Sequence, residues 1–292
     1  MAQAPRVWLV TGCSSGFGAE IARQALEQGE IVIATARRPE TLAGLQAGWP
    51  ETCLALPLDV CDAVQRGDAV AAALSRFGRI DVLVNNAGVS YLASIEEADE
   101  ARYRALFETN FFGPMALLRE ILPHMRARRS GRIVNFSSIG GIAAYPASGW
   151  YAATKFALEA ASEALAAEVA PLGIKVSLVE PGPFRTGMDA RAEHAEGGHP
   201  DYEETVGARR RQFRATGNDF PGDPVRGAGA VLELAKMEDP PLRLILGAPA
   251  LQVARAKFEG VLAEWTAHAA LSLSCDYPLP AGNAWDRVVK GA

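Results

Sequence analysis

The stretch VWLVTGCSSGFG, residues 7–18, joins an apolar run to a glycine-rich turn and the start of an amphipathic helix. The apolar run predicts a buried strand. Gly12 permits a tight turn, Gly16 lets the backbone approach a pyrophosphate closely, and Gly18 lets the helix pack against the strand. The N-terminus of such a helix also favours an anion. The stretch therefore predicts a strand–turn–helix unit that binds the phosphates of a dinucleotide.

The spacing of these glycines, G-x-x-x-G-x-G, differs from the G-x-G-x-x-G pattern of the standard dinucleotide-binding turn. No Gly-Lys-Ser/Thr follows, which excludes a P-loop. A merely structural turn is the alternative, and the strand–turn–helix context favours dinucleotide binding.

Short apolar runs alternate with longer helical patterns along the chain. Their near-continuous Val, Ile and Leu content is typical of a parallel sheet that is covered on both faces. The predicted strands are 7–11, 31–36, 53–58, 81–86, 132–137, 174–180 and 242–247, and the clearest helices are 17–28, 62–77, 101–127 and 150–170. The alternation predicts an α/β fold: a Rossmann-like, doubly wound parallel sheet of about seven strands with helices on both faces, in a single domain.

Two segments depart from this rhythm. Residues 183–222 are rich in Gly, Pro, His and charges, and they form a long connection of the kind that serves as a lid or binding loop. Residues 251–292 begin with helical spacing and end in a Pro/Gly-rich tail. We expect a dinucleotide-binding domain over 1–250, with a lid at 185–222, and a C-terminal helical extension and tail of the same domain over 251–292.

Composition excludes several classes of protein. The 292 residues are 49% hydrophobic and 22% charged, as in ordinary globular proteins, and the net charge of −5 argues against nucleic acid as a partner. No apolar run is long enough for a membrane span, and the N-terminus lacks a signal-peptide pattern. The four cysteines have no metal-ligand spacing, so we predict no metal site. Together these features predict a cytoplasmic protein.

Five motifs occur together: TGCSSGFG at 11–18, NNAG at 85–88, Ser138, YAATK at 151–155 and PGPFRT at 181–186. In this order and spacing they resemble the short-chain dehydrogenase/reductase family. The resemblance covers roughly residues 5–250. The TGCSSG and ATAR segments and the extended C-terminus look more like the hydroxysteroid-dehydrogenase-like members than the shorter acyl-chain reductases.

Tyr151 and Lys155 are four residues apart in a run of good helix formers, so they lie one above the other on a helix face. Reduction of a ketone needs a hydride on carbon, which a nicotinamide supplies, and a proton on oxygen. A free phenol with a pKa of about 10 is a poor acid at neutral pH, and a cation one turn away favours the phenolate. The resemblance therefore implies Tyr151 as general acid/base and Lys155 as its activator. A surface lysine beside a half-buried tyrosine is the alternative.

The resemblance implies two further catalytic residues. Ser138, 13 residues before Tyr151, holds the substrate oxygen through its hydroxyl; the alternative for Ser138 or the adjacent Ser137 is a serine that caps a turn. Asn110, inside a helix, holds a water that links Lys155 to solvent; the alternative is a buried structural amide.

The resemblance also implies the cofactor contacts. Asp59 binds the adenine amino group, with Val60 beside it, and Asn86 and Gly88 line the adenosine ribose. The full predicted set is Gly12, Ser14, Ser15, Gly16, Phe17, Gly18, Arg37, Asp59, Val60, Asn86, Gly88, Tyr151, Lys155, and Pro181, Gly182 and Thr186 at the nicotinamide carboxamide. For each contact outside the glycine turn, ordinary loop geometry is the alternative.

The end of the second predicted strand favours NADP(H) over NAD(H). Ala36 stands where NAD-dependent relatives carry an acid that binds the ribose 2′-hydroxyl. Arg37 follows, and a guanidinium binds phosphate in a bidentate and always-charged manner. If both Arg37 and Arg38 are merely solvated, NAD(H) is accepted as well.

We therefore expect an NADP(H)-dependent oxidoreductase that interconverts a ketone or aldehyde and an alcohol. A nucleotide-sensing regulator without catalysis and an epimerase or dehydratase of the extended relatives are the alternatives. The substrate is expected to be apolar or ring-containing, because Phe184, Met188, Phe213 and Phe220 lie near the lid, although these residues also suit a core. The resemblance also implies a homodimer or homotetramer, because members of the family are often dimeric or tetrameric.

Overall fold

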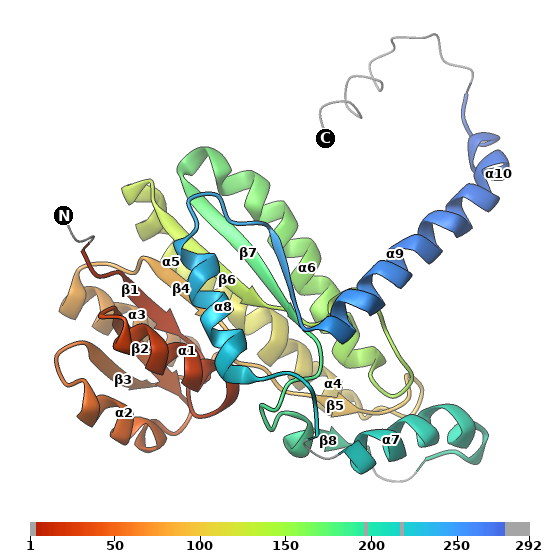
Figure 1. The fold of residues 1–292 in the computed structure, drawn as a ribbon, viewed down its shortest axis with the longest axis horizontal. Helices are drawn as coiled ribbons and strands as arrows, with labels where there is room; N and C mark the ends of the chain where they lie inside the picture. Colours follow the sequence, from red (N-terminus) through yellow and green to blue (C-terminus); the bar gives the residue numbers. More distant parts are fainter. Residues whose placement is uncertain (1–3, 196–197, 217–218, 278–292) are drawn as a thin grey trace.

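The computed structural model describes residues 4–195, 198–216 and 219–277. Seven strands form one sheet in which every neighbouring pair is parallel, in the order β3-β2-β1-β4-β6-β7-β9 (Figure 1). The strands are β1 (Val7–Val10), β2 (Ile31–Ala36), β3 (Cys53–Pro57), β4 (Val82–Asn85), β6 (Gly131–Phe136), β7 (Ile174–Pro181) and β9 (Arg243–Leu246). All seven predicted strands are confirmed, and the fold is the expected Rossmann-like single domain.

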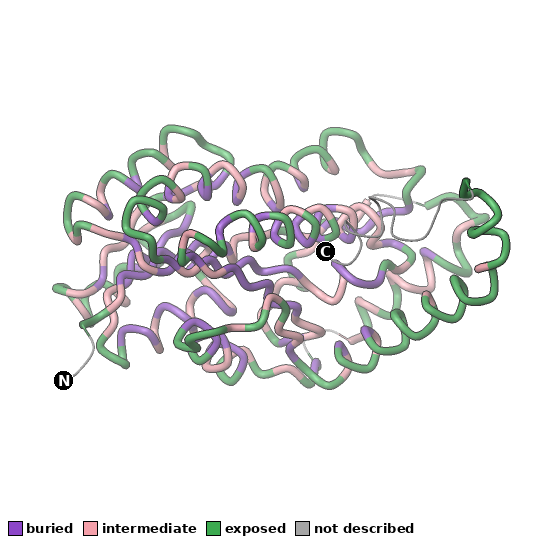
Figure 2. The backbone as a smooth tube through the Cα atoms, turned by 90° about the horizontal axis from the view of Figure 1, so that it is seen from above, coloured by how far each residue is buried: buried purple, intermediate pink, exposed green. Residues whose placement is uncertain are grey.

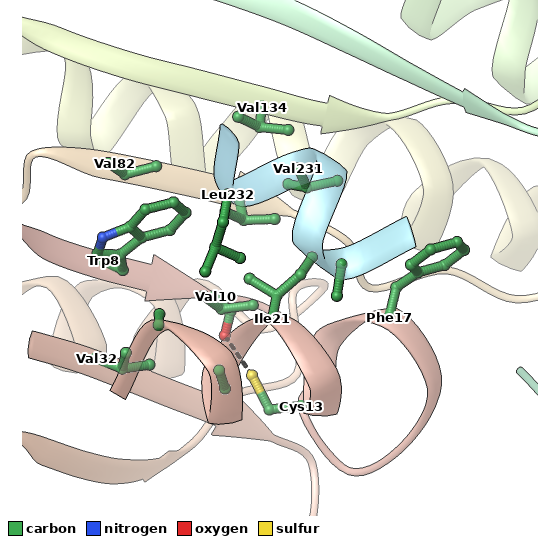
Figure 3. Close-up of a cluster of buried hydrophobic side chains, with 14 of the residues drawn as sticks. Trp8, Val10, Cys13, Phe17, Ile21, Val32, Val82, Val134, Val231 and Leu232 are labelled. Carbon is green, nitrogen blue, oxygen red and sulfur yellow. Dashed lines mark hydrogen bonds between the residues drawn. The ribbon is translucent and has the colours of Figure 1, made fainter. Parts of the chain in front are cut away.

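Alternate residues of the strands face two separate cores. Trp8 and Val10 of β1 belong to one cluster, whereas Leu9 between them belongs to the other, because successive side chains point to opposite faces of a sheet. Figure 3 shows the first cluster, in which Trp8 and Val10 lie beside Ile21 and Leu232. Both faces of the sheet are therefore buried, which explains the near-continuous apolar strands.

Helices cover each core. On the face of Trp8 lie α1 (Gly16–Glu27), α2 (Ala43–Gly48) and α8 (Pro224–Lys236). On the face of Leu9 lie α3 (Ala63–Phe77), α5 (Gly113–Arg128) and α6 (Gly149–Val169). Figure 2 shows buried residues concentrated along the centre of the molecule and exposed residues on the outer helices. Short 3₁₀ turns complete this part of the fold at Pro39–Leu42, Ile139–Gly141 and Ala170–Leu172.

The helix predicted over 101–127 is built from three pieces. It begins as α4 (Glu100–Phe107), passes through a π-helical turn at Glu108–Phe112, and continues as α5. Single π-helical turns inside α-helices are frequent at functional sites. This one contains Asn110.

The predicted lid leaves and rejoins the body at a narrow neck, where Arg185 N donates to Gly222 O at 3.0 Å and Gly222 N donates to Pro183 O at 3.1 Å. Beyond the neck, β8 (Glu193–His194) pairs in parallel with β5 (Tyr91–Leu92) of the body. The other elements of the segment are 3₁₀ turns at Asp189–Arg191 and Pro200–Tyr202, a π-helical turn at Glu203–Gly207, and α7 (Ala208–Thr216).

The C-terminal extension begins as α9 (Ala248–Ala267) and α10 (Ala269–Leu273), which project from the body (Figure 1). Only Ala250 and Ala254 of α9 are buried. The division of the chain at residue 250 stays a prediction, and the predicted tail at 278–292 lies outside the described residues. Within the described ranges, no helix has the length and apolar character to cross a membrane, and the cytoplasmic location also stays a prediction.

Candidate active site

The glycine turn lies at the carboxyl ends of β1 and β4. Gly12 has a φ of +74°, and a Cβ atom there would lie 3.0 Å from Cα of Ala87. A Cβ atom at Gly18 would lie 2.4 Å from the carbonyl oxygen of Gly12. The hydroxyl of Thr11 accepts hydrogen bonds from the backbone N–H groups of Asn86, at 3.0 Å, and Ala87, at 2.9 Å. These contacts fix the turn against the NNAG segment.

The N-terminus of α1 suits the phosphates of a dinucleotide. Its N-cap residue Ser15 makes no side-chain capping hydrogen bond, and the first turn carries no acidic residue. Gly16 has a φ of +58°, and a Cβ atom there would lie 3.0 Å from Cβ of Thr186. The backbone N–H groups and the glycines of the turn therefore fit a pyrophosphate.

Phe17 differs from the other residues of the turn because its side chain packs into the core. Its ring is 8% exposed and lies 5.2 Å from the ring of Phe136 and 4.9 Å from that of Phe184, measured between centroids. The ring therefore supports the turn from the core side, and a cofactor contact at this residue would use the backbone.

The end of β2 lies beside the same turn, because Cys13 N donates a 2.8 Å hydrogen bond to Thr35 O. Ala36 is buried, whereas Ser14 and Arg37 are exposed. The guanidinium of Arg37 and the hydroxyl of Ser14 are thus both exposed at the end of β2, where the sequence predicts the 2′-phosphate of NADP(H).

The residues predicted around the adenosine lie on the neighbouring loops. Asp59 Oδ1 accepts from Cys61 N at 3.0 Å, and Val60 is buried. The side-chain amide of Asn86 donates to Thr11 O at 2.8 Å, so this side chain braces the glycine turn.

Ser138 and Tyr151 converge on Gly140. Ser138 caps the 3₁₀ turn Ile139–Gly141, and its Oγ accepts from Gly140 N at 3.0 Å. A Cβ atom at Gly140 would lie 3.1 Å from Tyr151 Cε1 and 3.4 Å from Ser138 Oγ. Both hydroxyl-bearing side chains therefore flank one glycine, although they are 13 residues apart in the sequence.

Lys155 lies one turn further along α6 and is 4% exposed. Its Nζ donates a 2.8 Å hydrogen bond to Phe136 O and lies 5.8 Å from the ring centroid of Tyr151. Burial lowers the pKa of Lys155 to about 8, and the negative charge of Glu159 opposes that shift.

Asn110 is held by a dense set of hydrogen bonds from its π-helical turn. Its Oδ1 accepts from Val89 N and its Nδ2 donates to Val89 O, both at 2.9 Å, and Nδ2 also donates to Thr154 Oγ1 at 3.2 Å. A Cβ atom at Gly88 would lie 3.3 Å from Asn110 Oδ1 and 3.8 Å from Lys155 Nζ. The structure thus brings Asn110, Gly88 and Lys155 together.

The residues predicted at the nicotinamide follow β7. Gly182 N donates to Leu246 O at 3.0 Å, and a Cβ atom at Gly182 would lie 3.0 Å from Cβ of Ala250 at the start of α9. Pro181 ends β7, and Thr186 Oγ1 accepts from Met188 N at 3.3 Å. These residues therefore connect the sheet to the base of the lid segment.

A cavity of about 360 Å³ lies between the body and the lid segment, with a mainly apolar lining. Its lining includes Gly149, two residues before Tyr151 in the sequence, but neither Tyr151 nor Ser138. Its lining residues are Ala93, Ser94, Ile95, Glu96, Tyr145, Pro146, Ala147, Gly149, Tyr202, Thr205 and Val206. Nearby, the guanidinium of Arg209 lies 5.0 Å from the ring centroid of Tyr145 and 4.7 Å from that of Phe213.

The sequence reasoning did not single out a buried acidic pair behind Lys155. Glu159 of α6 is 7% exposed and Glu180 of β7 is 0% exposed. Burial and the negative charge of Glu159 raise the pKa of Glu180 well above its ordinary value, and the cation of Arg243 opposes that shift. A glutamate inside the apolar strand IKVSLVE was the available signal, because glutamate is almost never fully buried without a partner.

The comparisons with known proteins show the family of the chain. The family model described as short chain dehydrogenase matches residues 6–197. The chain belongs to this family. The short-chain dehydrogenase is 38% identical over 255 residues to a 3-ketodihydrosphingosine reductase of Bacteroides thetaiotaomicron, a match that covers 87% of this chain and 91% of the relative. It is also 38% identical over 262 residues to human retinol dehydrogenase 8, with 83% and 82% covered.

Solved structures support both the fold and the cofactor class. A short-chain dehydrogenase from Streptomyces avermitilis has a TM-score of 0.88 and 45% identity, and the match covers 94% of this chain and 100% of that one. A 3-ketoacyl-(acyl-carrier-protein) reductase from Brucella melitensis complexed with NADH has a TM-score of 0.71 and 25% identity, with 82% and 96% covered. A gluconate 5-dehydrogenase from Burkholderia cenocepacia in complex with NADP and tartrate has a TM-score of 0.70 and 26% identity, with 85% and 95% covered. This short-chain dehydrogenase is therefore a nicotinamide-dependent oxidoreductase of CH–OH and C=O groups.

Proposed function

We propose that this enzyme interconverts a ketone or aldehyde and an alcohol, with Tyr151 as general acid/base and NADP(H) as the preferred cofactor. One observation carries the proposal: Tyr151 and Ser138 flank Gly140, with the buried ammonium of Lys155 5.8 Å from the tyrosine ring. When bound, the reduced nicotinamide supplies a hydride. Ser138 Oγ holds the substrate oxygen, the hydroxyl of Tyr151 donates a proton to it, and Lys155 stabilises the resulting phenolate.

Asn110 has an indirect role in this proposal. Both ends of its side-chain amide bond to Val89, so a water that links Lys155 to solvent is best held by the backbone of the π-helical turn. Thr154 supports the arrangement, because its hydroxyl accepts from Asn110 and donates to the carbonyl oxygen of Tyr151 at 2.7 Å.

An apolar or ring-containing substrate is part of the proposal. The mainly apolar cavity between the body and the lid segment is of the size of small-molecule sites, and its lining residue Gly149 precedes Tyr151 by two positions. Retinol, in the name of one relative, is an apolar alcohol with a ring. A homodimer or homotetramer, which the family resemblance implies, completes the proposal.

The substitution Tyr151→Phe tests the chemistry, because it removes one hydroxyl and keeps the ring. We expect turnover of an active ketone from a panel of apolar and polar carbonyl compounds to fall roughly 10²–10⁴-fold, while the Kd of NADPH, measured by calorimetry, stays unchanged. Tyr103→Phe is the matched control, because Tyr103 stacks on Trp150 outside the reacting groups. A loss below tenfold in Tyr151→Phe would refute the assignment.

A further inference from the structure

Glu159, Glu180 and Arg243 come together from three elements behind the active site. Glu159 lies on α6 one turn after Lys155, Glu180 lies on β7, and Arg243 begins β9. Arg243 Nε lies 3.0 Å from Glu159 Oε2 and 3.6 Å from Glu180 Oε1. One guanidinium therefore lies beside two buried carboxylates, and it also binds the more exposed Glu163.

The hydrogen bonding of this cluster is incomplete if both acids are ionised. Glu159 Oε1 and both carboxylate oxygens of Glu180 are buried, and among the described residues they have no hydrogen-bond partner. A buried carboxylate oxygen without a donor costs free energy. Two like charges in one buried site also repel each other. One proton between the two acids removes both costs, because it neutralises one charge and supplies a donor.

The cluster contacts the loop that carries the substrate-binding serine. A Cβ atom at Gly141 would lie 2.5 Å from Ser137 Oγ and 3.2 Å from Glu159 Oε1. Ser137 Oγ is also buried and without a hydrogen-bond partner in the described chain. Glu159 thus lies one helical turn after Lys155 and beside the segment 137–141, which contains Ser138.

We propose that Glu159 and Glu180 share one proton and act as a counter-ion of single charge for Lys155, with a positioning role in the reaction. The shared proton leaves one negative charge, which lies beside Arg243 of β9 and one helical turn from Lys155 on α6. Of the other charged groups near the pair, Glu163 is 62% exposed and so screened by water. The single negative charge of the pair favours the protonated form of Lys155, and the ammonium still stabilises the phenolate of Tyr151. This role of Lys155 rests on the proposed function.

The pH dependence of Lys155 carries the functional consequence. Burial lowers the pKa of Lys155 to about 8, and Glu159 is the group that opposes this shift. Loss of the Glu159 charge lowers the pKa of Lys155 further, so the ammonium is lost at a lower pH. At an effective dielectric constant of about 20, one charge at a helical-turn distance accounts for about one pH unit or more.

Two measurements test the proposal. Infrared spectra of the full chain at neutral pH should show a protonated-carboxyl C=O band in the wild type. The wild type minus variant difference should contain this band for Glu180→Gln, which loses it, and lack it for Glu163→Gln, which keeps it. The alkaline limb of the kcat/KM profile for ketone reduction should move to lower pH in Glu159→Gln, by about one unit. It should not move to lower pH in Glu180→Gln, because the single negative charge then lies on Glu159. Glu163→Gln should leave the limb in place.

Each outcome is decisive. If the wild-type spectrum contains no protonated-carboxyl band that Glu180→Gln removes, the two glutamates do not share a proton. That conclusion does not depend on which reaction the enzyme catalyses. A band that behaves as expected, with equal loss of activity at all pH values and an unmoved limb, reduces the pair to a structural role. If no carbonyl compound is reduced, the proposed function fails, and the infrared result still stands on its own.

Discussion

The ammonium of Lys155 donates a 2.8 Å hydrogen bond to the backbone carbonyl oxygen of Phe136, and so ties α6 to the end of β6. The lysine that we propose for the reacting centre is therefore also part of the packing between helix and sheet. Because burial lowers its pKa to about 8, the charge of Lys155 varies close to neutral pH.

Replacement of Lys155 by methionine should change how stability depends on pH. In the wild type, the unfolded lysine keeps its proton up to its ordinary pKa of 10.5, whereas the folded one loses it near 8. The unfolded state binds more protons between these values, so the free energy of unfolding rises with pH there, by at most about 1.4 kcal/mol per pH unit. Lys155→Met should lack this rise in denaturant titrations across this range. Lys175→Met, which removes a more exposed lysine, should keep it. An equal rise in Lys155→Met would contradict the burial argument.

Arg37→Ala should weaken NADPH and spare NADH. A hydrogen bond to a charged group contributes about 1.5–3 kcal/mol, so we expect about a 10–150-fold increase in the Kd of NADPH by calorimetry. Adding Ala36→Asp should reverse the preference, because a carboxylate repels the 2′-phosphate and binds the 2′-hydroxyl. Arg38→Ala is the matched control. Wild-type enzyme that binds both cofactors equally would refute the role of Arg37.

The segment 185–222 should act as a mobile lid. Its contacts with the body are the neck beside Gly222, the short β5–β8 pairing, and mostly exposed polar pairs such as Arg102 with Glu193 and Tyr202 with Glu96. Exposed polar pairs are individually weak. With cofactor and substrate bound, limited trypsin cleavage after Arg191 and Arg209 should slow, while cleavage after Lys257 on α9 serves as the internal standard. Unchanged cleavage at all three sites would count against closure.

The projecting part of α9 should contribute little to the stability of the body. Phe258 is 61% exposed and Trp265 is 68% exposed, so serine at either position should change the free energy of unfolding by less than about 0.5 kcal/mol. Leu106→Ala, at a buried residue, should cost about 2–5 kcal/mol in the same denaturant titration. A large loss in Trp265→Ser would mean that α9 has a partner in solution.

The sequence alone was enough to predict the strands and the glycine turn, and it contains the motifs of the four residues that we propose for the active site. Continuous apolar runs are a local signal of strands buried on both faces, and β2 has the predicted bounds 31–36. The motifs around Tyr151 and Ser138 are also local, because each is a few residues long.

Tertiary structure alone decided what surrounds these motifs. The side chain of Asn110, in the π-helical turn, makes hydrogen bonds to Val89, 21 residues away. The acidic pair needs Arg243, 84 residues after Glu159, and the β5–β8 pairing joins segments about as far apart. Such contacts produce no periodic pattern of residues in the sequence. Each is determined by the packing of whole helices and strands and by the hydrogen-bond partners that buried polar groups require.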